Sequence, residues 1–290
     1  MKWKKEKTWK TNKIQESSFI YPQDGFKTNP YRGINYLRDQ IVPFLGGGKT
    51  IMNNECIYQY NERLELLRDS KILVIGGGPS TIEHEYDIQQ YDYIFSCNHF
   101  FKNIKLKQVK MFMVFLGDEV DLNHSDLEEY LSSNKDTIVC FENIGNPPGK
   151  QSFKQKYADR VLWAHTRYHS KIGAMTRIVS YLCNFSPKEI AIVGMDGPIL
   201  KKEQNIHYHA FEKHKEQTGT IESAVTEEEK MQKYKNQYLE FWDYILHDIG
   251  SGISFRNLGH GHKCNLTTKL LTDQVGEDYQ EYILNPEKRI

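Results

Sequence analysis

The sequence predicts an α/β protein with a doubly wound, mostly parallel, Rossmann-like sheet. From Lys71 onward, short apolar runs alternate with longer amphipathic stretches. The runs are continuously apolar, as is typical of strands that are covered on both faces of a sheet. The alternation of strand and helix favours parallel pairing, because parallel strands must be joined by a crossover segment.

The apolar runs and the stretches between them give the expected elements. Strands are expected at 71–76, 93–97, 110–116, 137–141, 160–165 and 189–196, with a late edge strand at 253–258. Helices are expected at 125–133, 171–184 and 226–248. Residues 1–70 are polar, aromatic-rich and poorly periodic, and we expect one helix there, at 55–68. The predicted organisation is an N-terminal extension (1–70), one α/β domain (71–265) and a C-terminal tail (266–290).

The overall charge of the chain favours no polyanionic partner, because 38 Lys and Arg balance 38 Asp and Glu. Residues 1–13 differ, with six Lys against one Glu. One interpretation is a solvated terminus. The other is a basic arm that contacts a polyanion such as DNA or an anionic glycan, with Trp3 and Trp9 available for stacking.

The cysteines and the apolar runs bear on the cellular compartment. The five cysteines show no paired spacing, which fits a reducing compartment. No apolar run approaches the ~20 residues that span a bilayer, and the N-terminus lacks the apolar region of a signal peptide. We therefore expect a cytoplasmic protein.

The strongest local signal is the turn formed by Gly76, Gly77, Gly78, Pro79 and Ser80, which follows a buried strand. Glycines let the backbone approach a phosphate, and a helix N-terminus after the turn would offer free N–H groups. The turn predicts a nucleotide site, although an ordinary tight turn between strand and helix is the alternative. The dinucleotide fingerprint G-x-G-x-x-G is not met.

The end of the second strand narrows the choice of nucleotide. Dinucleotide-binding proteins carry Asp or Glu about 20 residues after the glycines, to hold a ribose hydroxyl. Here that region reads Ser96-Cys97-Asn98-His99, without a carboxylate. A nicotinamide cofactor is therefore disfavoured. The amide of Asn98 suits recognition of a base edge or a sugar, and a turn residue at a strand end is the other interpretation.

Several short motifs, in this order, resemble the bacterial sialyltransferases of glycosyltransferase family 42. They are also similar to the related flagellin-modification and pterin-diphosphokinase-like domains. The matching segments are 76–80 (GGGPS), 97–100 (CNHF), 170–174 (SKIGA) and 194–196 (GMD), with a weaker match at 239–241 (LEF). The resemblance covers roughly 71–260.

The resemblance implies a sialyltransferase-like domain that binds a nucleotide-sugar and needs neither a cofactor nor a metal ion such as Mg²⁺. Its second turn position is Asn in that family and Gly77 here, which removes one side-chain contact. The implied nucleotide-binding residues are Gly76, Gly77, Gly78, Pro79, Ser80, Asn98, Gly173, Asp196 and Tyr208.

The polar segment 197–225 is a candidate lid over the site. It contains His207 and His209 on either side of Tyr208, with His214 farther along. Transfer of a sugar to a hydroxyl needs a base with a pKa near neutral, which histidine supplies. His207 or His209 is therefore the candidate catalytic base. A solvated surface cluster is one alternative, and a metal site is another, although side chains two positions apart diverge on a strand or helix.

The acidic stretch after the third predicted strand offers a further alternative. Asp118 and Asp121 follow Gly117 in a D-x-x-D pattern. Carboxylates there would hold Mg²⁺ on a diphosphate, or cap the next helix. Asp118 is also an alternative catalytic base.

Three functions follow from these patterns. The first is a glycosyltransferase that moves a sugar from a nucleotide-sugar to an acceptor hydroxyl, with inversion. The second is a Mg²⁺-dependent diphosphokinase of the pterin type. The third is a nucleotide-sugar-binding module without turnover.

Overall fold

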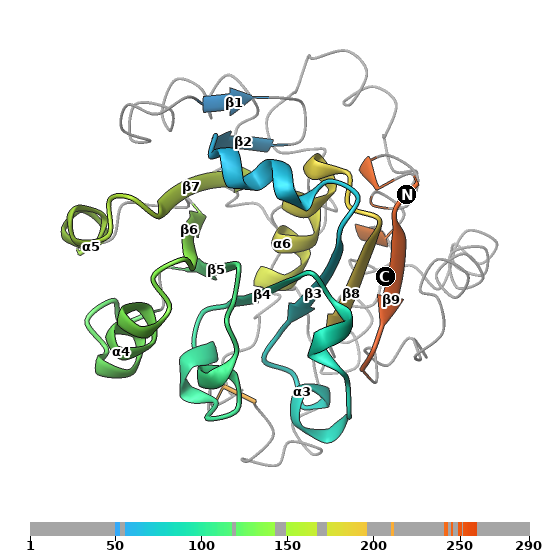
Figure 1. Ribbon diagram of the computed structural model, residues 1–290, viewed down its shortest axis with the longest axis horizontal. Coiled ribbons are helices and arrows are strands. Elements are labelled where there is room, and N and C mark those ends of the chain that lie inside the picture. The colour runs from blue at the N-terminus through green and yellow to red at the C-terminus, as the bar shows by residue number, and fades with distance from the viewer. Residues whose placement is uncertain are drawn as a thin grey trace, which may run out of the picture.

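The computed structural model describes residues 50–52, 56–117, 120–142, 149–166, 173–195, 210–211, 241–242, 245, 249–250 and 252–259. These residues form one nine-stranded sheet in the order β1-β2-β7-β6-β5-β4-β3-β8-β9 (Figure 1). Every neighbouring pair from β7 to β9 is parallel, and only the pairs that involve β2 are antiparallel. The predicted fold class is confirmed.

The parallel strands coincide with the predicted apolar runs. In β3, β4, β5 and β8 almost every residue is buried, as expected for strands covered on both faces. The late strand lies at the edge of the sheet, beside β8. The bounds are β3 (Lys71–Ile75), β4 (Tyr93–Cys97), β5 (Met113–Leu116), β6 (Ile138–Glu142), β7 (Val161–Thr166), β8 (Glu189–Val193) and β9 (Ser254–Asn257).

The helix predicted at 55–68 is wrong. β1 (Thr50–Met52) and β2 (Cys56–Gln59) extend the sheet beside β7, and a 3-10 helix, η3 (Glu62–Leu67), follows. Cys56, Tyr58 and Gln59 are buried, as is typical of a strand inside a sheet. The side-chain oxygen of Gln59 also accepts a hydrogen bond from the Trp163 backbone at 3.0 Å. Pairing with β7 therefore overrides the helical spacing.

Short helices connect the strands. α6 covers the sheet with seven of its nine residues buried, and α4 confirms the helix predicted at 125–133. Most of the helix predicted at 226–248 lies outside the described residues. The α-helices are α3 (Ser80–Glu83), α4 (Ser125–Ser133), α5 (Lys150–Lys156) and α6 (Ala174–Leu182). The remaining 3-10 helices are η4 (Ile88–Gln90), η5 (Phe100–Lys102), η6 (Leu106–Gln108) and η7 (Cys183–Phe185).

The strand order places a topological switch point between β3 and β8. From β3 the chain adds β4 on one side of the sheet, and it later returns to place β8 on the other side. Ligands of open α/β sheets bind at such a point, outside the carboxyl ends of the strands. In the part of the chain that the structure describes, no helix is long and apolar enough to cross a bilayer.

Candidate functional site

The turn of residues 76–80, called the glycine turn below, lies at the switch point. It follows the carboxyl end of β3, and α3 begins at its last residue (Figure 1). Gly194 follows the carboxyl end of the neighbouring strand β8. The fold thus brings together two of the segments that the sequence resemblance singles out.

The glycine turn and Gly194 are joined through their backbones. The Gly78 N–H donates to the Gly194 carbonyl at 2.9 Å, and the Gly76 N–H donates to Val193 at 2.8 Å. A Cβ at Gly76 would lie 2.6 Å from the Gly194 carbonyl oxygen, and a Cβ at Gly194 would lie 2.4 Å from that of Gly76. Glycine is required at both positions because the two backbones nearly touch.

Two hydroxyl groups brace this contact. The buried Ser80 hydroxyl accepts a hydrogen bond from the Gly194 N–H at 2.9 Å. The Thr81 hydroxyl donates to the Gly76 carbonyl at 2.7 Å. These bonds give Ser80 a structural role, and its assignment to ligand binding stays a prediction. Sequence reasoning missed Thr81, although its place after the turn in a strand–turn–helix unit was a usable signal.

Gly77 is the most accessible of the three glycines in this turn. In the described part of the chain, its N–H has no hydrogen-bond acceptor, whereas the N–H groups of Gly76 and Gly78 are both used. The turn therefore has one backbone donor that no described residue uses.

The N-terminus of α6 lies beside the same turn. A Cβ at Gly76 would lie 2.9 Å from the sulfur of Met175, in the first turn of α6. Gly173 caps this helix with a φ of 110°, and no side chain caps it. The helix after the glycine turn, α3, has only four residues. The longer helix whose positive dipole end adjoins the turn is therefore α6 rather than α3.

Asn98 links the ends of β4 and β5. Its side-chain oxygen accepts a hydrogen bond from the Gly117 N–H at 2.9 Å, and its own N–H donates to Phe115 at 2.8 Å. Its φ of 50° is left-handed, which asparagine tolerates better than most residues. These contacts fit a turn residue at a strand end. Recognition of a nucleotide by Asn98 stays a prediction.

Ala210 connects the glycine turn to a loop beyond β4. Its N–H donates to the Gly77 carbonyl at 3.0 Å, and its carbonyl accepts from the Asn103 side chain at 2.9 Å. Ala210 and Phe211 are both buried. No sequence signal pointed to Ala210, because its contact is made by the backbone alone.

Tyr86 is hydrogen-bonded to Thr81, the residue that follows the glycine turn. Its hydroxyl donates to the Thr81 carbonyl at 3.2 Å, and burial raises its pKa to about 12.

Several predicted site residues lie outside the described residues: Asp118, Asp196, His207, Tyr208 and His209. The basic segment 1–13 and the tail 266–290 lie outside them too. Among the residues that the structure does describe, no group of three or more His, Cys, Asp or Glu could hold a metal ion.

Comparisons with known proteins give matches among solved structures only. No protein-family model matches the chain, and no curated protein matches its sequence. One similar structure is the sialyltransferase CstII in complex with CMP, at a TM-score of 0.43 and 14% identity, covering 76% of this chain and 99% of the other. A second is CstII from Campylobacter jejuni with the substrate analogue CMP-3FNeuAc, at a TM-score of 0.43 and 16% identity, covering 76% and 100%.

An α-2,3-sialyltransferase from Campylobacter jejuni without ligand is also similar, at a TM-score of 0.43 and 14% identity, covering 70% of this chain and 80% of the other.

Proposed function

We propose that this protein is a glycosyltransferase that moves a sugar from a nucleotide-sugar donor to an acceptor hydroxyl. The observation that carries the proposal is the place of the glycine turn. It lies at the topological switch point of a parallel sheet, where such folds bind ligands, and it keeps the N–H of Gly77 without an acceptor among the described residues.

The donor phosphate would bind between the glycine turn and the N-terminus of α6. The Gly77 N–H would donate to a phosphate oxygen, and the positive end of the α6 dipole would stabilise its charge. The bonds of Gly194 to Gly78 and Ser80 support this role, because they fix the turn before the ligand arrives. Donors fixed in advance stabilise a leaving group without the cost of rearrangement.

The transfer itself would be a single displacement with inversion. The acceptor oxygen attacks the anomeric carbon as the bond from that carbon to the phosphate oxygen breaks. His207 or His209 takes the proton of the acceptor hydroxyl, and the nucleotide leaves with the bonding electrons. The hydrogen bond from the Ala210 N–H to the Gly77 carbonyl supports the choice of a histidine from this segment as the base, because Ala210 directly follows His209 in the chain.

The donor class is tested by thermal denaturation of the full-length protein with CMP-, UDP- and GDP-sugars. A ligand that binds the folded state raises its stability by about 2.7 kcal/mol at one hundred times its Kd. We expect one nucleotide class to raise the melting temperature, with or without EDTA. A shift with ATP that requires Mg²⁺, and none with any nucleotide-sugar, would instead support the diphosphokinase.

Turnover separates an enzyme from a binding module. The sugar donor that stabilises the protein is incubated with a mixture of mono- and oligosaccharide acceptors, and release of the free nucleotide is measured. We expect release that depends on an added acceptor. Donor binding with no release for any acceptor, and none to water, would support a module without turnover.

A further inference from the structure

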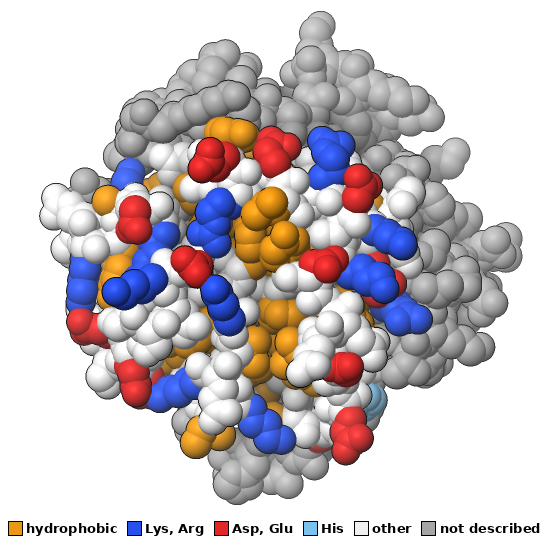
Figure 2. Space-filling model, in the orientation of Figure 1, with side chains coloured by type: hydrophobic (Ala, Val, Ile, Leu, Met, Phe, Trp, Pro, Cys, Tyr) orange, Lys and Arg blue, Asp and Glu red, His pale blue; other side chains and the backbone are white. Residues whose placement is uncertain are grey.

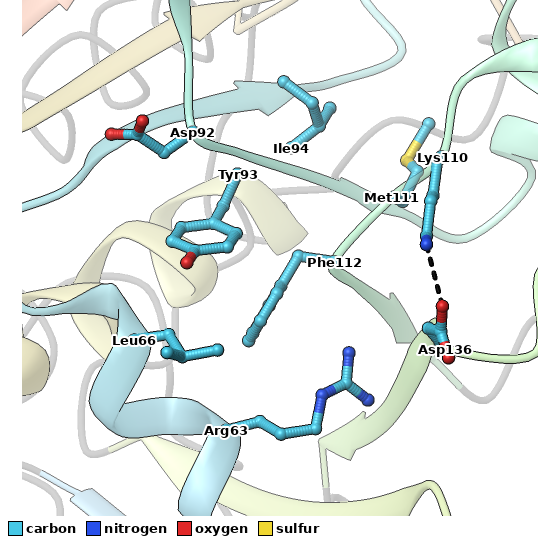
Figure 3. Close-up of a pocket in the computed structure, with 9 residues that line it drawn as sticks. All are labelled: Arg63, Leu66, Asp92, Tyr93, Ile94, Lys110, Met111, Phe112 and Asp136. Carbon is cyan, nitrogen blue, oxygen red and sulfur yellow. Dashed lines mark hydrogen bonds and ion pairs between the residues drawn. The ribbon is translucent and has the colours of Figure 1, made fainter.

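A cavity lies at the amino ends of the strands, the end of the sheet opposite to the glycine turn. It has a volume of about 370 Å³ and is bordered by residues at or just before the amino ends of β4, β5 and β6, together with η3 (Figure 3). Because these strands are parallel, their amino ends all lie at the same end of the sheet, and this end faces away from the candidate nucleotide site. The cavity is within the size range of small-molecule sites.

The cavity has an aromatic floor. The rings of Tyr93 and Phe112 meet edge to face, with their centroids 4.8 Å apart. Leu66 lines the same cavity from η3 and is 53% exposed. Figure 2 shows hydrophobic side chains gathered near the centre of the face that it presents, with basic and acidic side chains around them. The floor is suited to the flat apolar face of a ring.

Arg63 is held over this floor. The carbon of its guanidinium lies 5.3 Å from the centroid of the Phe112 ring. Its backbone N–H donates to the Asn61 side chain at 3.0 Å, which fixes the start of η3. Figure 3 shows the side chain extending along the cavity from η3 toward Phe112. The attraction between the guanidinium and the ring face favours this placement of the side chain.

The charges around the cavity leave Arg63 as the cation without an ion-pair partner. Lys110 pairs with Asp136 at 2.7 Å, and the charge of Arg63 also contributes to lowering the pKa of Asp136. The Asp92 carboxylate, on the same lining, accepts a hydrogen bond from the uncharged backbone N–H of Lys71 at 2.8 Å, which is not an ion pair. Within the described part of the chain, Arg63 forms no salt bridge, and its side chain has no hydrogen-bond acceptor. A guanidinium is the side chain best shaped for a carboxylate, which it binds through two parallel hydrogen bonds.

We propose that this cavity binds a small ligand with a carboxylate attached to a ring that has an apolar face. Arg63 holds the carboxylate, and the ring lies against Phe112, Tyr93 and Leu66. Both aromatic acids and sugar acids have this chemistry. The site is separate from the proposed nucleotide site, so its occupancy does not depend on the function proposed above.

The proposal is tested by ligand-observed NMR titration of the full-length protein with two matched pairs of probes. Phenylacetate is compared with phenylacetamide, and glucuronate with glucose, so that each pair differs mainly in the carboxylate. We expect at least one acid to bind about tenfold or more tightly than its neutral partner, which corresponds to about 1.4 kcal/mol. The pair that responds identifies the kind of ring.

Two arginine variants test where the acid binds. Arg63→Met keeps the apolar stem over Phe112 and removes the guanidinium, so it should abolish the preference for the acid. Arg68→Met is the matched control, because it removes the same charge at the end of η3 without touching the cavity. The proposal is overturned if neither acid binds better than its neutral partner, or if Arg63→Met binds the acid as tightly as Arg68→Met does.

Discussion

The hydroxyl oxygen of Ser80 accepts a hydrogen bond from the backbone N–H of Gly194 at 2.9 Å, across 114 residues of sequence. The bond joins the turn after β3 to the turn after β8, and both partners are buried. Together with the bond from Gly78 to the Gly194 carbonyl, it joins the segments that follow β3 and β8 at the switch point. The glycine turn is thus held by a segment that is distant in the sequence.

Ser80→Ala should destabilise the fold. The substitution leaves the Gly194 N–H buried without its acceptor, which costs about 1–3 kcal/mol. Ser152→Ala is the control, because the Ser152 hydroxyl is exposed and donates only to Gly149; we expect its effect to stay within about 0.5 kcal/mol. Urea denaturation measures both. Equal stability of the two variants would show that the bond contributes nothing.

The residue at position 77 should control nucleotide affinity through charge. Gly77→Asp places a carboxylate next to the proposed phosphate, and we expect it to weaken nucleotide binding about tenfold or more through like-charge repulsion. Gly77→Asn has nearly the same size without the charge, so it should bind as tightly as the wild type or more tightly. Calorimetric titration with the stabilising nucleotide measures both. If the two variants bind alike, the phosphate lies elsewhere.

The two hydrogen bonds of the Ala210 backbone, to Gly77 and from Asn103, should contribute to the affinity for the donor. Ala210→Pro removes the N–H that bonds to Gly77. Asn103→Asp removes the side-chain donor to the Ala210 carbonyl but keeps the oxygen that accepts from Lys105 and Leu106. We expect each to raise the Kd of the donor, with Ala210→Pro having the larger effect. Wild-type Kd and turnover in both folded variants would show that these hydrogen bonds are not part of the site.

A histidine base predicts different results for two neighbouring variants. His207→Ala or His209→Ala, but not both, should lower the single-turnover rate by about 10²–10⁴ while donor affinity is largely kept. We favour His207. The rate in the wild type should rise with pH as the base loses its proton, and this dependence should vanish in the inactive variant. If both variants keep the wild-type rate, Asp118→Asn is the next test.

The carboxyl group of Asp126 should titrate below its ordinary pKa of 3.8. A hydrogen bond from Lys107, at 2.8 Å, is the largest cause of this lowering. The pair therefore contributes stability above 3.8, and the contribution is lost as the pH falls through the lowered pKa. Lys107→Met should return the midpoint toward 3.8 in a carboxyl NMR titration.

A second lysine variant is the control for this titration. Lys110→Met should raise the lowered pKa of Asp136, its own partner, and leave Asp126 unchanged. A midpoint of Asp126 that does not move in Lys107→Met would contradict the assigned cause.

The candidate site was only partly predictable. The glycine turn and Gly194 were visible as motifs, because close backbone contact tolerates only glycine and therefore leaves a trace in the sequence. Ala210 left no such trace, since any residue with a backbone N–H could make its bond to Gly77. The cavity beside Arg63 was invisible for another reason: its residues come from segments 63–66, 92–94, 110–112 and 136, each of which is unremarkable by itself.

The sequence by itself determined the parallel sheet, because strands buried on both faces must be apolar at every position, and that pattern is local. It did not determine the secondary structure of residues 55–68, because their pattern suits a helix as well as a strand. Pairing with β7 determined that this segment begins as a strand, because β7 offers an open edge and the pairing satisfies the backbone hydrogen bonds of β2. Tertiary structure likewise decided which strands flank β3, and so where the switch point lies, because strand order depends on contacts between segments far apart in the chain.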